Sequence, residues 1–130
     1  MKTLLYLARH GQTQWNKVQR FQGQLDSALT PAGEQQSAAL AEQLMNKDIT
    51  LIVSSSLGRA IASAAICQKT LDVPTINLSG LIERDLGHWQ GKHVEDIKND
   101  KHYHEILQQF TELKPVDGES AMQCGERIYQ

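Results

Sequence analysis

Three short apolar runs with the character of β-strands set the pattern of this chain. They cover Leu4–Ala8, Ile49–Val53 and Thr75–Leu78, and such short runs between polar residues are typical of strands covered on both faces. Between the first two, Thr30-Pro31 predicts a helix start, with threonine as the N-cap and proline at the first helical position. Leu57 to Gln68 is rich in alanine and isoleucine and predicts a second helix. This alternation predicts parallel strands joined by right-handed crossovers.

The rest of the chain carries a weaker pattern. Residues 12–29 are polar without a clear period, which predicts a loop or a short irregular helix, and residues 94–110 predict one or two helices lying over the sheet. Pro115–Gly118 is typical of a turn, and Ser120–Gln123 fits the capping box that opens a helix. With no linker or internal repeat in view, we expect a single α/β domain over residues 1–130.

Composition limits the class of partner. The chain is 40% hydrophobic and 22% charged with a formal net charge of -2, so it has no general attraction for nucleic acid or an anionic membrane. Leu4–Ala8 is too short for a signal-peptide core, and no apolar stretch approaches the roughly 20 residues that cross a bilayer. Cys67 and Cys124 fit neither a disulfide framework nor a metal site. We therefore expect a cytoplasmic protein without metal, membrane or nucleic-acid partners.

Two of the strand ends carry residues suited to a phosphoryl group. Arg9 and His10 supply a cation and a nucleophile after the first run, and Ser54–Arg59 supplies hydroxyls, a helix start and a second guanidinium after the next. The carboxyl ends of strands in open α/β sheets are where ligands bind. Each residue also has a structural reading, because a lone His10 is typical of a hydrogen-bonded strand end and a lone Arg59 of a helix surface.

The first of these segments resembles a known family signature. Arg9-His10-Gly11-Gln12-Thr13-Gln14-Trp15-Asn16 is similar to the signature of the histidine phosphatase superfamily, which has the phosphoglycerate mutase-like fold. Further segments resemble the family in the same order and together extend the resemblance over nearly the whole chain: the loop around Gly23, the phosphate-binding segment Ser54–Ala60, the acid-bearing loop Leu81–Gly91 and the late helix start Asp117–Ser120.

The resemblance implies a fold and a set of roles. The fold would be a three-layer α/β/α arrangement with a mostly parallel sheet, and the activity that of a phosphomonoester hydrolase working through a phosphohistidine, without a cofactor. His10 would attack phosphorus, and Glu83 would act as the general acid and then as the base, with Asp85 as a weaker rival. The residues implied to bind the phosphoryl group are Arg9, Asn16, Gly23 and Arg59.

The sequence also departs from the family pattern. The resemblance implies a second catalytic histidine, followed by glycine, after a later strand that lies centrally in the sheet. No remaining histidine fits that description: these are His88, His93, His102 and His104. We therefore expect a C-terminally incomplete domain that lacks the later central strand. Such a domain would rearrange its sheet or borrow a strand from a second copy in a homodimer.

Several functions stay open at this point. The chain could be a phosphatase, a phosphoglycerate mutase-type phosphotransferase, a phosphate-binding module without turnover, or a gene fragment without a stable fold. The short spacing between Glu83 and Glu119 favours the phosphatase branch, whose cap is small. The expected partner is a small phosphorylated metabolite, and the mixed charges of residues 92–116 do not specify which one.

Overall fold

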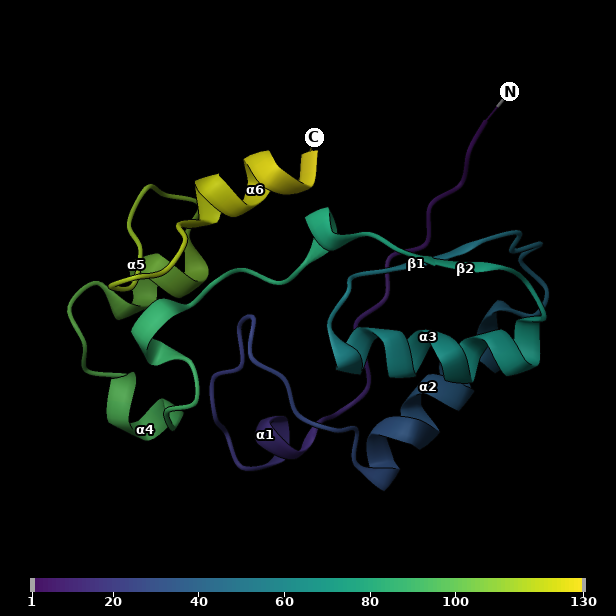
Figure 1. Ribbon diagram of the computed structural model, residues 1–130, viewed down its shortest axis with the longest axis horizontal. Helices are drawn as coiled ribbons and strands as arrows, with labels where there is room; N and C mark the ends of the chain where they lie inside the picture. The colour runs from purple at the N-terminus through teal and green to yellow at the C-terminus, as the bar shows by residue number, and fades with distance from the viewer. Residues whose placement is uncertain (1, 130) are drawn as a thin grey trace.

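A computed structural model describes residues 2–129 and follows the predicted alternation for much of the chain (Figure 1). The parallel strands are β1 (Ile52–Ser54) and β2 (Thr75–Asn77), and two 3-10 turns are η1 (Ser79–Leu81) and η2 (Gly87–Trp89). The α-helices are α1 (Gln14–Lys17), α2 (Pro31–Leu44), α3 (Gly58–Leu71), α4 (Val94–Ile97), α5 (Tyr103–Gln108) and α6 (Ala121–Tyr129).

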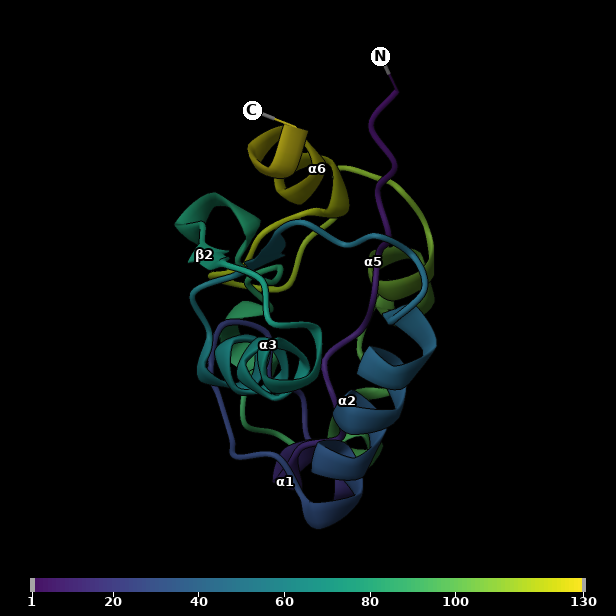
Figure 2. The same cartoon turned by 90° about the vertical axis from the view of Figure 1, so that its right-hand side faces the viewer.

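The central layers are a two-stranded sheet and two long helices. β1 and β2 pair in parallel, with Ile52 opposite Thr75 and Ser54 opposite Asn77, as the alternation predicts. α3 packs on both strands and α2 packs along α3 (Figure 2). The predicted N-cap of α2 is confirmed, since the Thr30 side chain accepts the Gly33 N–H at 3.0 Å and Pro31 occupies the first turn.

The predicted strand at Leu4–Ala8 is wrong. These residues form an exposed coil that runs past the sheet, with Leu4 75%, Leu5 80% and Leu7 89% exposed (Figure 1). No backbone group of residues 3–9 makes a backbone hydrogen bond within the described chain. A cavity of about 530 Å³ separates this segment from β1. Because a strand needs a neighbour for its N–H and C=O groups, the apolar run stays unpaired here.

A second group of elements lies at the other end of the molecule from β1 and β2 (Figure 1). Its core is built on Trp89, Ile97 and Ile106, with the Phe21 and Tyr103 rings 5.6 and 5.7 Å from that of Trp89. The prediction of one or two helices within residues 94–110 is confirmed, since α4 and α5 lie there. Their predicted place over the sheet is wrong, because their apolar residues pack against this aromatic core instead.

α6 begins at the predicted capping box. The Ser120 hydroxyl accepts the Gln123 N–H at 3.0 Å, and the Gln123 side chain accepts the Ser120 N–H at 2.9 Å. The predicted turn before it is confirmed by the Gly118 N–H, which donates to the Pro115 carbonyl at 3.0 Å. These local contacts place α6 next to η1, and thereby next to the loop that carries Glu83.

Candidate functional site

His10 lies at the end of the N-terminal coil, and one of its ring nitrogens is engaged in a hydrogen bond. Its Nδ1 lies 2.7 Å from the Gly11 carbonyl oxygen, which can only accept, so Nδ1 carries the proton and Nε2 keeps a lone pair. The ring is half-buried, and this burial lowers its pKa below the ordinary value of 6.5. The hydrogen bond with the Gly11 carbonyl opposes this lowering of the pKa. The positive charges of Arg59 and Arg9 lower the pKa further, and the negative charge of Glu83 raises it. His10 is therefore a neutral imidazole with a free nucleophilic nitrogen at neutral pH.

The turn after His10 is anchored although the segment before it is an exposed coil. The Gly11 N–H donates to the Ser63 hydroxyl of α3 at 3.0 Å, and that hydroxyl donates to the Arg59 carbonyl at 2.8 Å. On the other side, a Cβ at Gly11 would lie 2.3 Å from the Gly33 carbonyl oxygen of α2. Glycine at position 11 therefore allows the backbone to sit between α2 and α3, which fixes His10.

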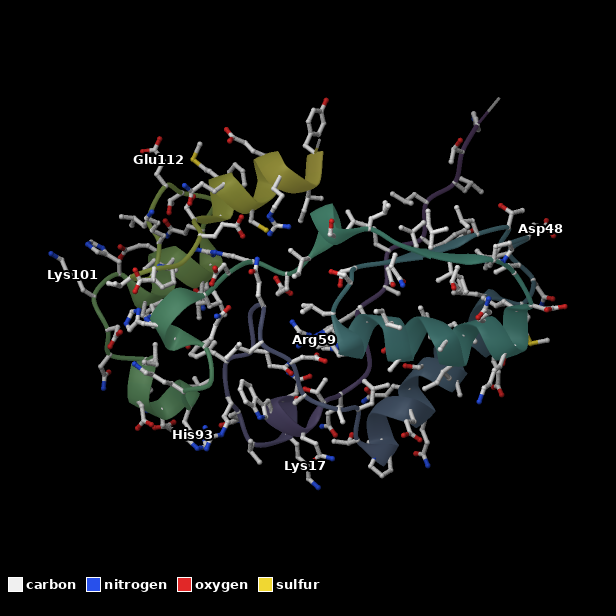
Figure 3. The ribbon with its side chains drawn as sticks, in the orientation of Figure 1. Lys17, Asp48, Arg59, His93, Lys101 and Glu112 are labelled. Atoms are coloured by element: carbon white, nitrogen blue, oxygen red, sulfur yellow. The ribbon has the colours of Figure 1, made fainter. Side chains whose placement is uncertain are left out.

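Arg59 lies at the N-terminal end of α3 and points toward the middle of the molecule (Figure 3). It is 3% exposed, so the surface cation expected of a lone helical arginine is excluded. Its Nη1 donates to the Leu25 carbonyl at 2.5 Å and to the Asp26 carboxylate at 3.3 Å, and Nη2 donates to the Gly23 carbonyl at 2.6 Å. Of the five N–H groups of a guanidinium, Nε–H and one on Nη2 remain for a phosphoryl oxygen.

Asn16 and Gly23 are held by the loop that surrounds α1. The Asn16 side-chain oxygen accepts the Thr13 N–H at 3.1 Å in a capping box, which leaves the Asn16 NH₂ group as a donor. Gly23 has φ +55°, and a Cβ there would lie 2.3 Å from the Gln90 side-chain oxygen. This positive φ favours glycine at position 23, and the Gly23 carbonyl accepts a hydrogen bond from Arg59.

One cavity of about 320 Å³ brings the sequence-predicted site residues together. Its walls include all six of them: Arg9, His10, Asn16, Gly23, Arg59 and Glu83. Asp85, the rival acid, is not in this lining; its carboxylate accepts the Gly87 N–H at 2.8 Å instead. His10 also borders neighbouring cavities of about 420 and 500 Å³, since no strand flanks the coil that leads to it.

Sequence reasoning missed several walls of this cavity. The further lining residues are Arg20, Phe21, Gln22, Arg84, Leu86 and Leu107. Arg20 and Arg84 bring two more guanidiniums, but both donate to backbone carbonyls: Arg20 to Gly91 at 2.6 Å and Arg84 to Ile106 at 2.6 Å. The aperiodic residues 12–29 carry no pattern that could place Arg20. Arg84 lies within the acid-bearing loop, where the resemblance implies a role only for its neighbours.

The described residues contain no cluster of three or more metal-ligating side chains. His88, His93 and His102 make separate contacts with Val116, Val18 and Glu105. No helix in residues 2–129 is long and apolar enough to cross a membrane.

One cavity on an α/β fold thus combines a histidine, arginines and a carboxylate, residue types that suit phosphoryl transfer. The family model for the histidine phosphatase superfamily (branch 1) matches residues 5–130, and the chain belongs to this superfamily. The α/β fold and the resemblance to phosphoglycerate mutase-like proteins are thereby confirmed.

Curated relatives and solved structures agree with this membership. The "probable phosphoglycerate mutase GpmB" of Citrobacter koseri is 36% identical over an alignment that covers 95% of this chain and 59% of that protein. A mycobacterial glucosyl-3-phosphoglycerate phosphatase is 34% identical with a TM-score of 0.83, covering 91% of this chain and 57% of its own. Bacillus stearothermophilus YhfR is 31% identical with a TM-score of 0.82, covering 92% and 60%. The chain thus spans about three-fifths of the length of the curated relatives it matches.

Proposed function

We propose that this chain hydrolyses phosphate monoesters through a phosphohistidine formed on His10. The observation that carries the proposal is the cavity whose lining includes His10, Arg9, Arg59 and Glu83. A committed Nδ1 and a lowered pKa leave Nε2 of His10 ready to attack. The mycobacterial phosphatase supports hydrolysis as the reaction, and that protein has been solved in complex with inorganic phosphate.

The proposed reaction has two steps. Nε2 of His10 attacks phosphorus while the bond to the ester oxygen breaks, and Glu83 protonates that leaving oxygen. Water then attacks the phosphohistidine, Glu83 takes its proton, and the P–N bond breaks to release phosphate. In both steps the charge on the phosphoryl oxygens is offset by Arg9, by the remaining donors of Arg59 and by the Asn16 amide. No step requires a metal or a cofactor.

We propose a small phosphorylated metabolite as the substrate and the cytoplasm as the location. The unpaired Cys67 and Cys124 support a reducing compartment. The alternative is phosphoryl transfer to a second hydroxyl, which the relatives named as probable phosphoglycerate mutases support. In the mutase reaction, the phosphohistidine would pass its phosphoryl group to an alcohol rather than to water.

We also propose that a second copy of the chain pairs with the open edge of β1. Ile52 and Ser54 direct their backbone groups to β2, so the intervening Val53 directs its N–H and C=O to the opposite, unpaired edge. The coil at residues 4–8 has unpaired backbone groups and exposed leucines, and the same coil from a partner could supply a strand there.

Hydrolysis of p-nitrophenyl phosphate in EDTA, by this chain and by His10→Ala, tests the proposed reaction. The proposal expects turnover in the parent that is insensitive to EDTA and abolished in the variant. Phosphate binding without turnover in either protein would replace the enzyme with a phosphate-binding module. Turnover that survives in His10→Ala would reject the phosphohistidine.

A further inference from the structure

We propose that Arg127 of α6 is a positioning residue that holds the acid-bearing loop so that Glu83 faces His10. The inference rests on the proposed function, in which Glu83 protonates the leaving oxygen. Glu83 is an exposed residue in the partly buried segment between η1 and η2, outside any helix or strand. A general acid must be held within hydrogen-bond reach of its target. Something beyond regular secondary structure must therefore restrain this loop.

Arg127 contacts three carbonyls within residues 80–83, the backbone segment that carries the Glu83 carboxylate. Its Nη1 donates to the Gly80 carbonyl at 2.9 Å and to the Ile82 carbonyl at 2.7 Å. Its Nη2 lies 3.3 Å from the carbonyl of Glu83 itself. One planar guanidinium thus fixes the loop immediately before its catalytic side chain, a task that the rigid fork of arginine suits better than the point charge of lysine.

Glu119 orients Arg127 and extends the restraint to the other side of Glu83. Its two carboxylate oxygens accept Nε and Nη2 of Arg127 at 3.0 and 2.8 Å. The same carboxylate accepts the Asp85 N–H at 3.1 Å, and the Glu119 carbonyl accepts Nε of Arg84 at 2.7 Å. Hydrogen bonds from the region of α6 therefore bracket Glu83 on both sides.

The Glu83 carboxylate, which lies between these restraints, is free to take part in the reaction. The Glu83 carboxylate accepts only the N–H of its neighbour Arg84, at 2.8 Å, among the described residues. It lies on the wall of two cavities that also contain His10. Arg127 is absent from the lining of the 320 Å³ cavity, so its effect on the reaction must pass through the loop.

The test compares two aryl phosphates that differ in their need for an acid. p-Nitrophenolate leaves readily without a proton, whereas phenolate, whose conjugate acid resembles tyrosine with a pKa of about 10, needs one. We expect Arg127→Met to lower kcat on phenyl phosphate by about 10²-fold, the lower end of general-acid contributions, and on p-nitrophenyl phosphate only a few-fold. Arg127→Lys should fall between the parent and Arg127→Met.

A double-mutant cycle separates positioning from simple destabilisation. Glu83→Gln should show the same selectivity between the two esters, and adding Arg127→Met to it should cost no further activity on phenyl phosphate. Glu126→Gln is the matched control on α6, since its exposed side chain makes no hydrogen bond among the described residues. Equal losses on both esters, or additive losses in the cycle, would overturn the inference.

Hydrogen exchange tests the restraint without relying on turnover. Arg127→Met should speed amide exchange in residues 80–85 and leave α3 unchanged, and unchanged exchange in the loop would overturn the inference. If the parent chain shows no His10-dependent hydrolysis, the proposed function fails by itself. The exchange result then still decides whether Arg127 holds the loop.

Discussion

Replacing Arg59 by methionine tests whether this residue stabilises the loop of residues 23–26 against α3. The guanidinium is 3% exposed and ties α3 to residues 23–26 through three acceptors. Methionine keeps much of the apolar stem and removes every donor. The variant therefore isolates the contribution of the charged hydrogen bonds.

The expected loss follows from the surroundings of the three acceptors. A hydrogen bond to a charged group contributes roughly 1.5–3 kcal/mol, and the cost is largest where water cannot replace the lost donor. The Gly23 carbonyl belongs to a buried residue, whereas Leu25 is 44% exposed and the Asp26 side chain 37% exposed. Counting the Gly23 bond in full and discounting the other two, we expect Arg59→Met to lower the free energy of unfolding by about 3 kcal/mol.

Urea unfolding followed by tryptophan fluorescence measures this loss, because Trp89 is 1% exposed and reports on the folded state. Lys69→Met is the matched control, since Lys69 lies exposed near the other end of α3 without a hydrogen bond in the described chain. The control should stay within about 0.5 kcal/mol of the parent. A similarly small effect of Arg59→Met would refute a structural role for the guanidinium.

Three further outcomes are expected. The pKa of His10, measured by NMR titration, should lie below 6.5 in the folded chain and near 6.5 in the urea-unfolded chain. Because the folded state disfavours the protonated ring, the free energy of unfolding should fall as the pH drops through 6.5. A folded pKa at or above the unfolded pKa would contradict the burial argument. Ser120→Ala should lower the free energy of unfolding by about 1 kcal/mol because the α6 cap is lost, whereas Ser56→Ala, at an exposed position, should leave it unchanged. Equal unfolding midpoints for the two variants would show that the cap is dispensable. Leu5→Lys should shift sedimentation from dimer to monomer if the N-terminal coil supplies a strand to a second copy, and a parent chain that is monomeric at every concentration would exclude that dimer.

Local signals in the sequence were sufficient to predict where α2 and α6 begin. The Thr30 N-cap and the Ser120–Gln123 capping box involve residues three positions apart, and both formed as expected. The Ile49–Val53 run yielded β1, at Ile52–Ser54, because β2 lies beside it. Leu4–Ala8 shows the limit of such reasoning. Its apolar pattern is equally suited to a strand, but pairing depends on a neighbour that no local pattern can reveal.

The sequence predicted which residues form the candidate site better than it predicted the contacts that these residues make. All six residues named from the sequence line one cavity, because each lies at a strand or coil end, a helix start or a loop that the fold brings together. The sequence could not show that Arg59 donates three hydrogen bonds, two to loop carbonyls and one to the Asp26 carboxylate. It also could not show that Arg127, which belongs to none of the quoted motifs, contacts the loop that carries Glu83. Such side-chain contacts across long sequence separations depend on the tertiary structure alone.

Trapping the covalent intermediate tests the central claim most directly. The chain is mixed with p-nitrophenyl phosphate, quenched within one turnover in base, where phosphohistidine survives, and the modified residue is located by mass spectrometry. We predict one phosphoryl group, on His10, that is lost in acid and absent in His10→Asn. Release of p-nitrophenol without a phosphoryl group on His10, or with one on another residue, would contradict the account.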